Sequence, residues 1–122
     1  MERYAIVSVP GEDPILLHCF PGDTLELAEL QQIVCGYIES VPTVLAKEWS
    51  DEDGVGTVLF VNEEGKLNGL PVNEWATDIS ALYNDVIVGN AILMGVKGED
   101  VIGLTERAAK NIMKRWGNYN AE

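Results

Sequence analysis

Alternating stretches of apolar and turn-forming residues open the chain. Residues 4–9 are rich in β-branched side chains and are followed by Pro10 and Gly11, a combination that favours a strand ending in a turn. Residues 14–20 have a similar composition, and the short loop between the two stretches suits a hairpin. The pattern therefore predicts antiparallel strands at residues 4–9 and 14–20.

The next segment has the spacing of an amphipathic helix. Its apolar residues recur at positions i, i+3 and i+7, namely Leu27, Leu30 and Val34. Asp23 followed by Glu26 matches a capping box with an acidic cap, and Gly36 is placed to adopt the left-handed conformation that closes helices. We expect a helix over residues 24–35.

Extended segments are predicted in the middle of the chain. Residues 37–41 and 43–49 look extended, and Pro42 between them, which has no N–H to donate, indicates a sheet edge or a bulge. Residues 50–54 predict a polar turn. The strand expected at residues 56–62 is nearly all apolar, which indicates a central strand or one covered on both faces.

Loop-forming residues dominate the segment after this strand. Asn73 is positioned to cap a short helix that we expect to run through Leu82. The apolar residues 85–89 and 91–96 surround a Gly-Asn pair. They predict either two strands joined by a tight turn or one bulged strand.

The C-terminal segment predicts a second main helix, with apolar residues on one side and basic residues on the others. Thr105 supplies an N-cap for a helix over residues 105–117. Its apolar side consists of Ala108, Ile112, Met113 and Trp116, and its basic residues are Arg107, Lys110, Lys114 and Arg115. Together the elements predict one small α+β domain over residues 1–122, with five to six mostly antiparallel strands packed with two main helices.

Charge restricts the partners of the domain. Among 122 residues, 20 acidic against 8 basic side chains give a formal net charge of −12, which disfavours direct binding to nucleic acid and to anionic membranes. Residues 1–103 carry a net −14, whereas residues 104–122 carry +2, so an anionic partner would dock at the C-terminal helix. Basic residues near a helix C-terminus also complement the helix dipole without any ligand.

The sequence also bears on compartment and cofactors. No apolar stretch reaches the roughly 20 residues that span a bilayer, and the N-terminal residues lack a basic region followed by an apolar one. We therefore expect a cytoplasmic protein without membrane contact. Cys19 and Cys35 lack zinc-site spacing, and we expect both to be buried free thiols, with no metal and no cofactor.

The usual patterns of catalytic residues are missing from the sequence. His18 is the single histidine, so a catalytic triad or a zinc site would have to depend on it alone. The acidic residues 51–53 lack the spacing of a calcium loop. A hydrolase that uses Glu63, Glu64 or Asp85 as acid and base is the least favoured function, since adjacent glutamates at a turn are usually solvated.

An amide-rich loop offers better candidates for ligand binding. Asn62, Lys66 and Asn73 lie at or after the end of the apolar strand, where loop side chains could converge on a ligand. Trp75 is nearby and could stack on a heterocycle or roof the core. The alternative is that Asn62 and Asn73 satisfy backbone groups of an irregular loop.

Three motifs resemble a known family. They are LQQIVCGYIE at residues 30–39, NEEGKLNGLPVN at residues 62–73 and DVIVG at residues 85–89. In this order and spacing they resemble a short domain of unknown function from phages, plasmids and bacterial mobile elements, whose members run LQxxVGGYIE, NEEGKLxGLPxN and DxIxG. The resemblance covers residues 4–105, and Cys35 stands where many members carry glycine.

The resemblance implies a genomic setting in which small acidic proteins often act by binding. It also selects the polar positions that match the motifs as binding candidates: Asn62, Glu63, Lys66, Asn73 and Asp85. From this setting we expect a non-enzymatic protein that counteracts host defence.

The favoured form of this function is the sequestration of a small nucleotide-derived signal. Lys66 would neutralise phosphate, while Asn62 and Asn73 would read the base or ribose. Trp75 or Tyr37 would stack, in a homodimer or higher oligomer if the site spans an interface. The alternative is an acidic DNA mimic or a direct protein inhibitor that covers a basic groove of a host defence or restriction enzyme.

Overall fold

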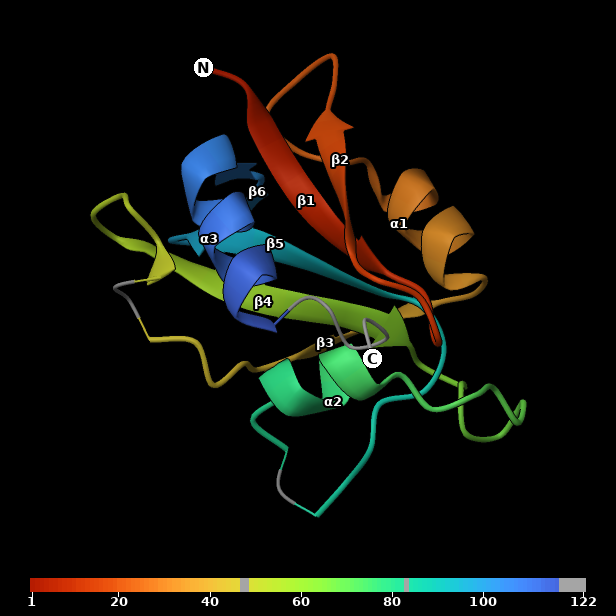
Figure 1. Cartoon of the computed structure of the whole chain (residues 1–122). Helices are drawn as coiled ribbons and strands as arrows, with labels where there is room; N and C mark the ends of the chain where they lie inside the picture. The colour runs from red at the N-terminus through yellow and green to blue at the C-terminus, as the bar shows by residue number, and fades with distance from the viewer. Residues whose placement is uncertain (47–48, 83, 117–122) are drawn as a thin grey trace.

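One antiparallel sheet organises the computed structural model of the chain, which describes residues 1–46, 49–82 and 84–116 (Figure 1). Within these residues the sheet has seven strands: β1 (Arg3–Ser8), β2 (Ile15–Cys19), β3 (Ile38–Val41), β4 (Val55–Asn62), β5 (Ala91–Lys97), β6 (Asp100–Ile102) and β7 (Leu104–Thr105). The main order is β2-β1-β5-β4-β3, while β6 pairs with β5 and β7 pairs with β1. The predicted antiparallel α+β domain is confirmed, and the short β6 and β7 add to the expected strands.

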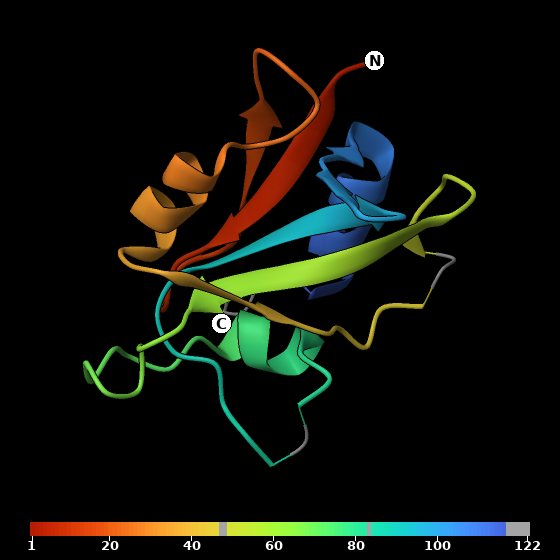
Figure 2. The same cartoon turned by 180° about the vertical axis from the view of Figure 1, so that it is seen from behind.

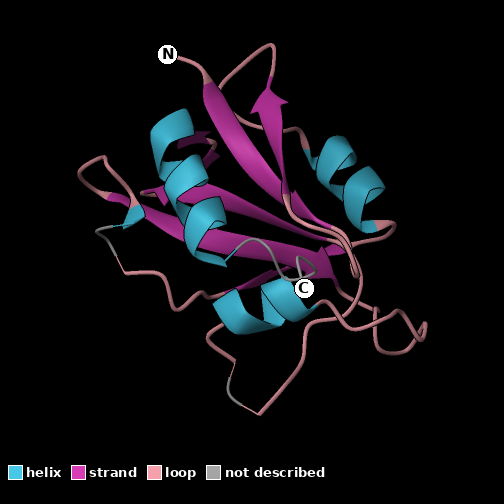
Figure 3. Ribbon diagram, in the orientation of Figure 1, coloured by secondary structure: helices cyan, strands magenta, loops and turns pink. Residues whose placement is uncertain are grey.

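Both faces of the sheet are buried because its strands alternate two sets of apolar side chains. In β5, Leu93 packs with residues of α2 (Glu74–Ile79) and α3 (Glu106–Trp116), whereas Ile92 and Met94 pack with residues of α1 (Leu27–Val34). Figure 1 shows α3 in front of the sheet and Figure 2 shows it behind, and Figure 3 separates helices from strands by colour. The sheet thus separates two core layers, one beneath α2 and α3 and the other beneath α1.

Several predicted strands are confirmed. β1 and β2 form the expected hairpin, with Ala5 opposite Leu17. β4 lies between β3 and β5, which agrees with the central strand predicted at residues 56–62. β3 is an edge strand, and Pro42 follows it directly, as the missing proline N–H indicated.

The extended segment predicted at residues 43–49 is not a strand. Its regular pairing is limited to an isolated bridge between Thr43 and Ser80, and residues 47–48 lie outside the described residues. After Pro42 the chain leaves the sheet and pairs with the end of α2 instead. Strand-like pairing in this segment is thus limited to Thr43 among the residues that the structure describes.

The residues 85–89 also form a loop, so the pair Gly89-Asn90 is neither a hairpin turn nor a bulge in a strand. Their pairing consists of one isolated bridge, between Val72 and Val88. Gly89 has a φ of 78°, a left-handed conformation that favours glycine, and a Cβ there would also displace the end of the Leu70 side chain, whose Cδ1 would lie 2.7 Å away. The segment has an apolar pattern because the loop contributes a side chain, Ile87, to the hydrophobic core.

The N-terminus of α1 lies later in the chain than predicted. Glu26, rather than Asp23, is the N-cap, and its N–H donates to the carboxylate of Glu29 at 3.0 Å. Asp23 instead belongs to the preceding loop, where its carbonyl accepts the N–H of Gly103 at 2.7 Å. That contact joins the loop to the β6–β7 connection and keeps Asp23 from capping the helix.

The C-terminus of α1 differs from the prediction in two ways. Cys35, with a φ of 64°, adopts the left-handed conformation expected of Gly36. Gly36 is required for space instead, because a Cβ there would lie 2.7 Å from Nδ2 of Asn62. The expectation of two buried thiols is wrong for Cys35, which is exposed, whereas Cys19 is buried and its burial raises the pKa of the thiol to about 11.

The predicted caps of the other helices are confirmed. Asn73 and Thr105 each accept a hydrogen bond from the backbone N–H three residues later, at 2.9 and 3.1 Å. α2 ends at Ile79 rather than Leu82, because Ser80 turns to an extended conformation. None of the helices in the described ranges is long and apolar enough to cross a membrane.

Candidate binding site

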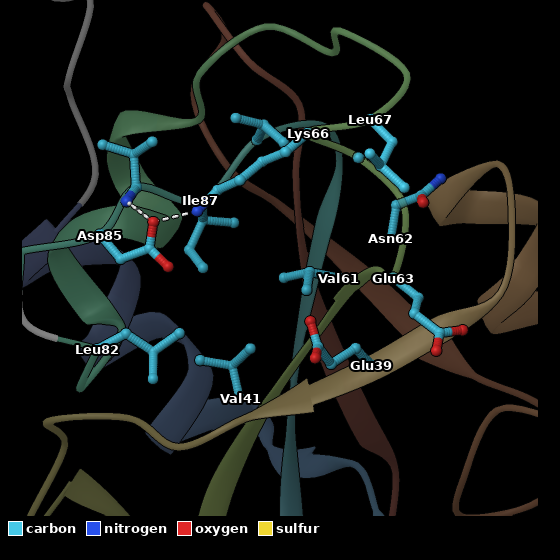
Figure 4. A pocket seen from close by; sticks show the side chains of 13 residues that line it. Glu39, Val41, Val61, Asn62, Glu63, Lys66, Leu67, Leu82, Asp85 and Ile87 are labelled. Atoms are coloured by element: carbon cyan, nitrogen blue, oxygen red, sulfur yellow. Dashed lines mark hydrogen bonds and ion pairs between the residues drawn. The ribbon is translucent and has the colours of Figure 1, made fainter.

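A pocket of about 140 Å³ lies where the end of β4 meets the loop before β5 (Figure 4). It is lined by Glu39, Val41, Val61, Asn62, Glu63, Gly65, Lys66, Leu67, Leu82, Asp85, Val86, Ile87 and Val88. Four of the side chains predicted as site residues are therefore brought together: Asn62, Glu63, Lys66 and Asp85. The first and second sequence motifs meet the third in this pocket.

Lys66 and Asp85 form an ion pair at one side of the pocket. The Lys66 ammonium donates to Oδ1 of Asp85, which also accepts the N–H of Val86 at 2.9 Å. These hydrogen bonds, first that from Lys66, lower the pKa of Asp85 below its ordinary 3.8. Both side chains are about half exposed, so the pair adds little to stability. Its consequence is that the charge of Lys66 is already neutralised.

The other carboxylates of the pocket differ in direction. In Figure 4 the carboxylate of Glu39 extends from β3 toward the middle of the pocket, whereas that of Glu63 points away from the ion pair. Within the described residues, the Glu39 side chain has no hydrogen bond or ion pair. Sequence analysis missed Glu39, because only the pairing of β3 with β4, which sets Glu39 opposite Val61, brings it here.

The acidic side chains make the pocket negative. Three carboxylate residues and one lysine line the pocket, namely Glu39, Glu63, Asp85 and Lys66, so a cationic ligand is favoured over an anionic one. In the described part of the chain, no group of three or more possible metal-ligating side chains comes together.

Asn62 lines the pocket, but its amide serves the backbone. Nδ2 donates to the carbonyls of Val34 at 3.0 Å and Cys35 at 3.3 Å, at the end of α1, and Oδ1 accepts the N–H of Glu64 at 2.8 Å. These bonds satisfy helix carbonyls that otherwise lack a partner. Asn62 thus has the structural role that was the alternative to ligand binding.

Asn73 lies outside this pocket and is 1% exposed. Its Nδ2 donates to the carbonyls of Ser8 at 3.2 Å and Gly89 at 3.0 Å, while Oδ1 accepts the N–H of Ala76 at 2.9 Å and the Ser8 hydroxyl at 3.1 Å. Every donor and acceptor of the amide is used. Asn73 therefore connects β1, the loop before β5 and α2.

The two aromatic candidates are placed very differently. Trp75, in α2, is 2% exposed and is part of the hydrophobic core. Tyr37 is 67% exposed, and its carbonyl accepts the N–H of Glu63 at 2.9 Å. Tyr37 is thus exposed and joined through its backbone to a residue that lines the pocket, whereas Trp75 is buried.

Exposed apolar side chains surround the opening. Leu67, Leu82 and Val86 line the pocket yet remain exposed, Leu67 to 84%. Leu67, Leu82 and Val86 form what we call the apolar rim. Leu67 comes from the loop after β4, and the other two come from the loop before β5, so no single sequence window identifies them.

Comparison with known proteins identifies a family without an activity. No curated protein and no solved structure matches the chain. The model of one family, a domain of unknown function (DUF3846), matches residues 2–117, which span all the strands and helices described above. The chain therefore belongs to the DUF3846 family, a domain of unknown function.

Proposed function

We propose that this protein acts by occupying a partner protein, and that its pocket and apolar rim hold a basic side chain of that partner. The setting is the one implied by the sequence resemblance, in which a protein of a phage or mobile element inhibits a host defence or restriction enzyme. The observation that carries the proposal is the carboxylate of Glu39, which has no hydrogen-bond or ion-pair partner among the described residues and is directed into a small pocket with exposed apolar side chains around it.

The size of the pocket suits a side chain better than a nucleotide. Its volume of about 140 Å³ is below the roughly 300–1,000 Å³ of typical small-molecule sites. Asn62 and Asn73, which were expected to read a base or ribose, are engaged with the backbone. The amide-rich loop therefore supports the inhibitor hypothesis more than the sequestration of a nucleotide-derived signal.

An arginine of the partner matches the chemistry of the pocket. Its guanidinium can donate two parallel hydrogen bonds to the carboxylate of Glu39. The apolar stem of the same side chain can pack on Leu67 and Val86 while the charged head enters the pocket. The net charge of −12 adds long-range attraction toward a basic surface, such as a groove that binds nucleic acid.

The binding proposal is tested by titrating peptides while amide NMR shifts are recorded. An arginine peptide flanked by leucines is compared with the same peptide carrying citrulline, which keeps the shape but not the charge. We expect shifts at the pocket, and binding weakened about tenfold by citrulline or by Glu39→Gln. Glu99→Gln, in the exposed turn after β5, is the matched control. Equal binding by the Glu39 variant, or shifts confined to other regions, would contradict the proposal.

The partner itself is sought by native mass spectrometry of the protein purified from cells that express a defence system. The proposal expects a basic protein that co-purifies with the unaltered chain and is lost in Glu39→Gln. Recovery of that protein with the variant would overturn the assignment of the pocket, and multiple turnover of a substrate would overturn action by occupancy.

A further inference from the structure

A groove of about 490 Å³ lies at the C-terminal end of α3, and it shares no residue with the pocket described above. It is lined by Trp49, Asn111, Lys114 and Arg115. The ring of Trp116 adjoins it, with its centroid 4.9 Å from that of Trp49 and an interplanar angle of 66°, an edge-to-face pair. We call this region the indole groove.

The groove contains positive charge that no carboxylate of residues 1–46, 49–82 and 84–116 neutralises. Within the described residues, neither Lys114 nor Arg115 has a carboxylate within 4.0 Å, whereas Lys110, one turn earlier, pairs with Glu106 at 2.8 Å. The guanidinium of Arg115 lies 5.1 Å from the ring centroid of Trp116, in a cation–π contact. Two exposed cations thus stand together in a strongly acidic protein.

The helix dipole explains only part of this arrangement. Cations in the last turn of a helix are favourable wherever around the helix they point. Here Asn111, Lys114 and Arg115 are spaced i, i+3 and i+4, so they share one face of α3. That face adjoins the indole pair and an open groove, which the dipole does not require.

The turn that carries Trp49 is fastened to the rest of the domain. Asp51 accepts a hydrogen bond from the Thr105 hydroxyl at 2.7 Å, and Thr105 also caps α3. Glu52 accepts two hydrogen bonds from Arg3, at 2.6 and 2.8 Å. These bonds hold the turn that follows Trp49 against β1 and the start of α3, so that Trp49 and the helix face belong to one connected part of the domain.

We propose that the indole groove binds a nucleoside monophosphate. The base stacks against the indole pair, the phosphate pairs with Lys114 and Arg115, and the Asn111 amide hydrogen-bonds the edge of the base. The volume of about 490 Å³ falls in the roughly 300–1,000 Å³ range of small-molecule sites. Repulsion from the acidic remainder is screened beyond about 8 Å at physiological ionic strength.

This inference goes beyond the proposed function and uses different residues. A nucleotide-type ligand, expected from the sequence at the amide-rich loop, finds its complementary chemistry at the end of α3 instead. The binding of a basic partner at the pocket does not depend on it.

The test is calorimetric titration with AMP, adenosine and inorganic phosphate as separate probes. We expect saturable binding of AMP, and at least about tenfold weaker binding of adenosine and of phosphate, because each lacks one half of the recognised chemistry. The double variant Lys114→Gln/Arg115→Gln should weaken AMP binding at least about tenfold. Arg107→Gln/Lys110→Gln removes the same charge from the same helix outside the groove and should leave binding unchanged.

A second variant addresses the stacking interaction. Trp49→Leu should weaken AMP and adenosine alike while leaving the weak phosphate binding unchanged, and its thermal unfolding is recorded because Trp49 also packs against the core. No saturable AMP binding, or equal losses in the two double variants, would overturn the proposal. Glu39→Gln should bind AMP normally, so failure at this groove and failure at the pocket are distinguishable.

Discussion

The pocket beside β4 and the indole groove beside α3 carry opposite charge on one small domain. In the pocket the lysine is paired and the Glu39 carboxylate is open, whereas in the groove two cations stand without carboxylate neighbours among the described residues. The loops of the pocket are held by hydrogen bonds of Asn62 and Asn73. The groove is formed by one face of α3 and by Trp49, next to the turn that Asp51 bonds to Thr105. A polar residue of a motif, such as Asn73, can therefore support a pocket from outside it. The side chains of the groove, in contrast, belong to none of the three motifs.

The largest expected effect tests whether the asparagines are structural. Asn73→Ala removes the cap of α2 and leaves the buried carbonyls of Ser8 and Gly89 without their donors. We expect the free energy of unfolding, measured by urea denaturation, to fall by about 3 kcal/mol. Asn68→Ala, in the exposed loop, is the control and should change it by less than about 0.5 kcal/mol. Equal losses in both variants would return Asn73 to the ligand candidates.

A smaller effect is expected on the side of the groove. Arg3 lowers the pKa of Glu52 below 4.5, so their pairing stabilises the fold at pH values above 4.5 and this contribution is lost as the pH falls through the lowered pKa. Glu52→Gln should therefore cost about 1 kcal/mol at pH 7 and almost nothing near pH 2. Denaturation at both pH values checks this. A cost independent of pH would mean that Glu52 acts through packing rather than charge.

The end of α1 beside the pocket offers a stabilising change. Cys35 has a φ of 64°, a conformation that costs conformational free energy for a residue with a Cβ but not for glycine. Cys35→Gly should raise the free energy of unfolding by about 0.5 kcal/mol, after allowance for the greater flexibility of glycine in the unfolded chain. Cys35→Ser keeps the strain and should match the unaltered protein. If glycine destabilises the protein, the contacts of the cysteine side chain contribute more free energy than the backbone strain costs.

The smallest effect on stability is expected for the Lys66–Asp85 ion pair, which sets the charge of the pocket apart from that of the groove. Lys66→Gln removes the lysine of the pocket and should let the pKa of Asp85 rise toward 3.8, as followed by carboxyl NMR titration. Because the pair is exposed, thermal unfolding should scarcely change. Arg107→Gln, far from Asp85 in the sequence and outside the pocket, should leave that titration unaltered. An unchanged pKa in Lys66→Gln would show that the backbone N–H of Val86 dominates instead.

Elements with signals within a few residues were predictable from sequence. The β1–β2 hairpin and the caps at Asn73 and Thr105 depend on side chains close in the chain, and all three are present. The segments 43–49 and 85–89 failed because an extended apolar stretch does not specify its partner. Thr43 pairs with Ser80, outside the sheet.

The site was predictable only in part. Four residues selected from the motifs, Asn62, Glu63, Lys66 and Asp85, line one pocket. The amide of Asn62 nevertheless bonds to the end of α1, which only the folded chain brings within reach. The same limit applied at the helix end, where the side chain of Asn62 requires the glycine at position 36 for space and leaves Cys35 to take the left-handed conformation. The indole groove needs Trp49 beside α3, a contact between segments far apart in the sequence.

The strand order has a consequence for synthesis of the protein. β1 pairs with β5 through contacts such as Ile6 opposite Leu93, so the middle of the sheet is closed by strands from opposite ends of the chain. A ribosome-bound chain that has not yet released β5 holds two separate strand pairs, each with an unpaired edge. The sheet therefore closes only after β5 has been released from the ribosome, because its central pairing joins strands that are far apart in the sequence. Until then the open edges invite pairing with other chains, so we expect the protein to depend on chaperones while it is made.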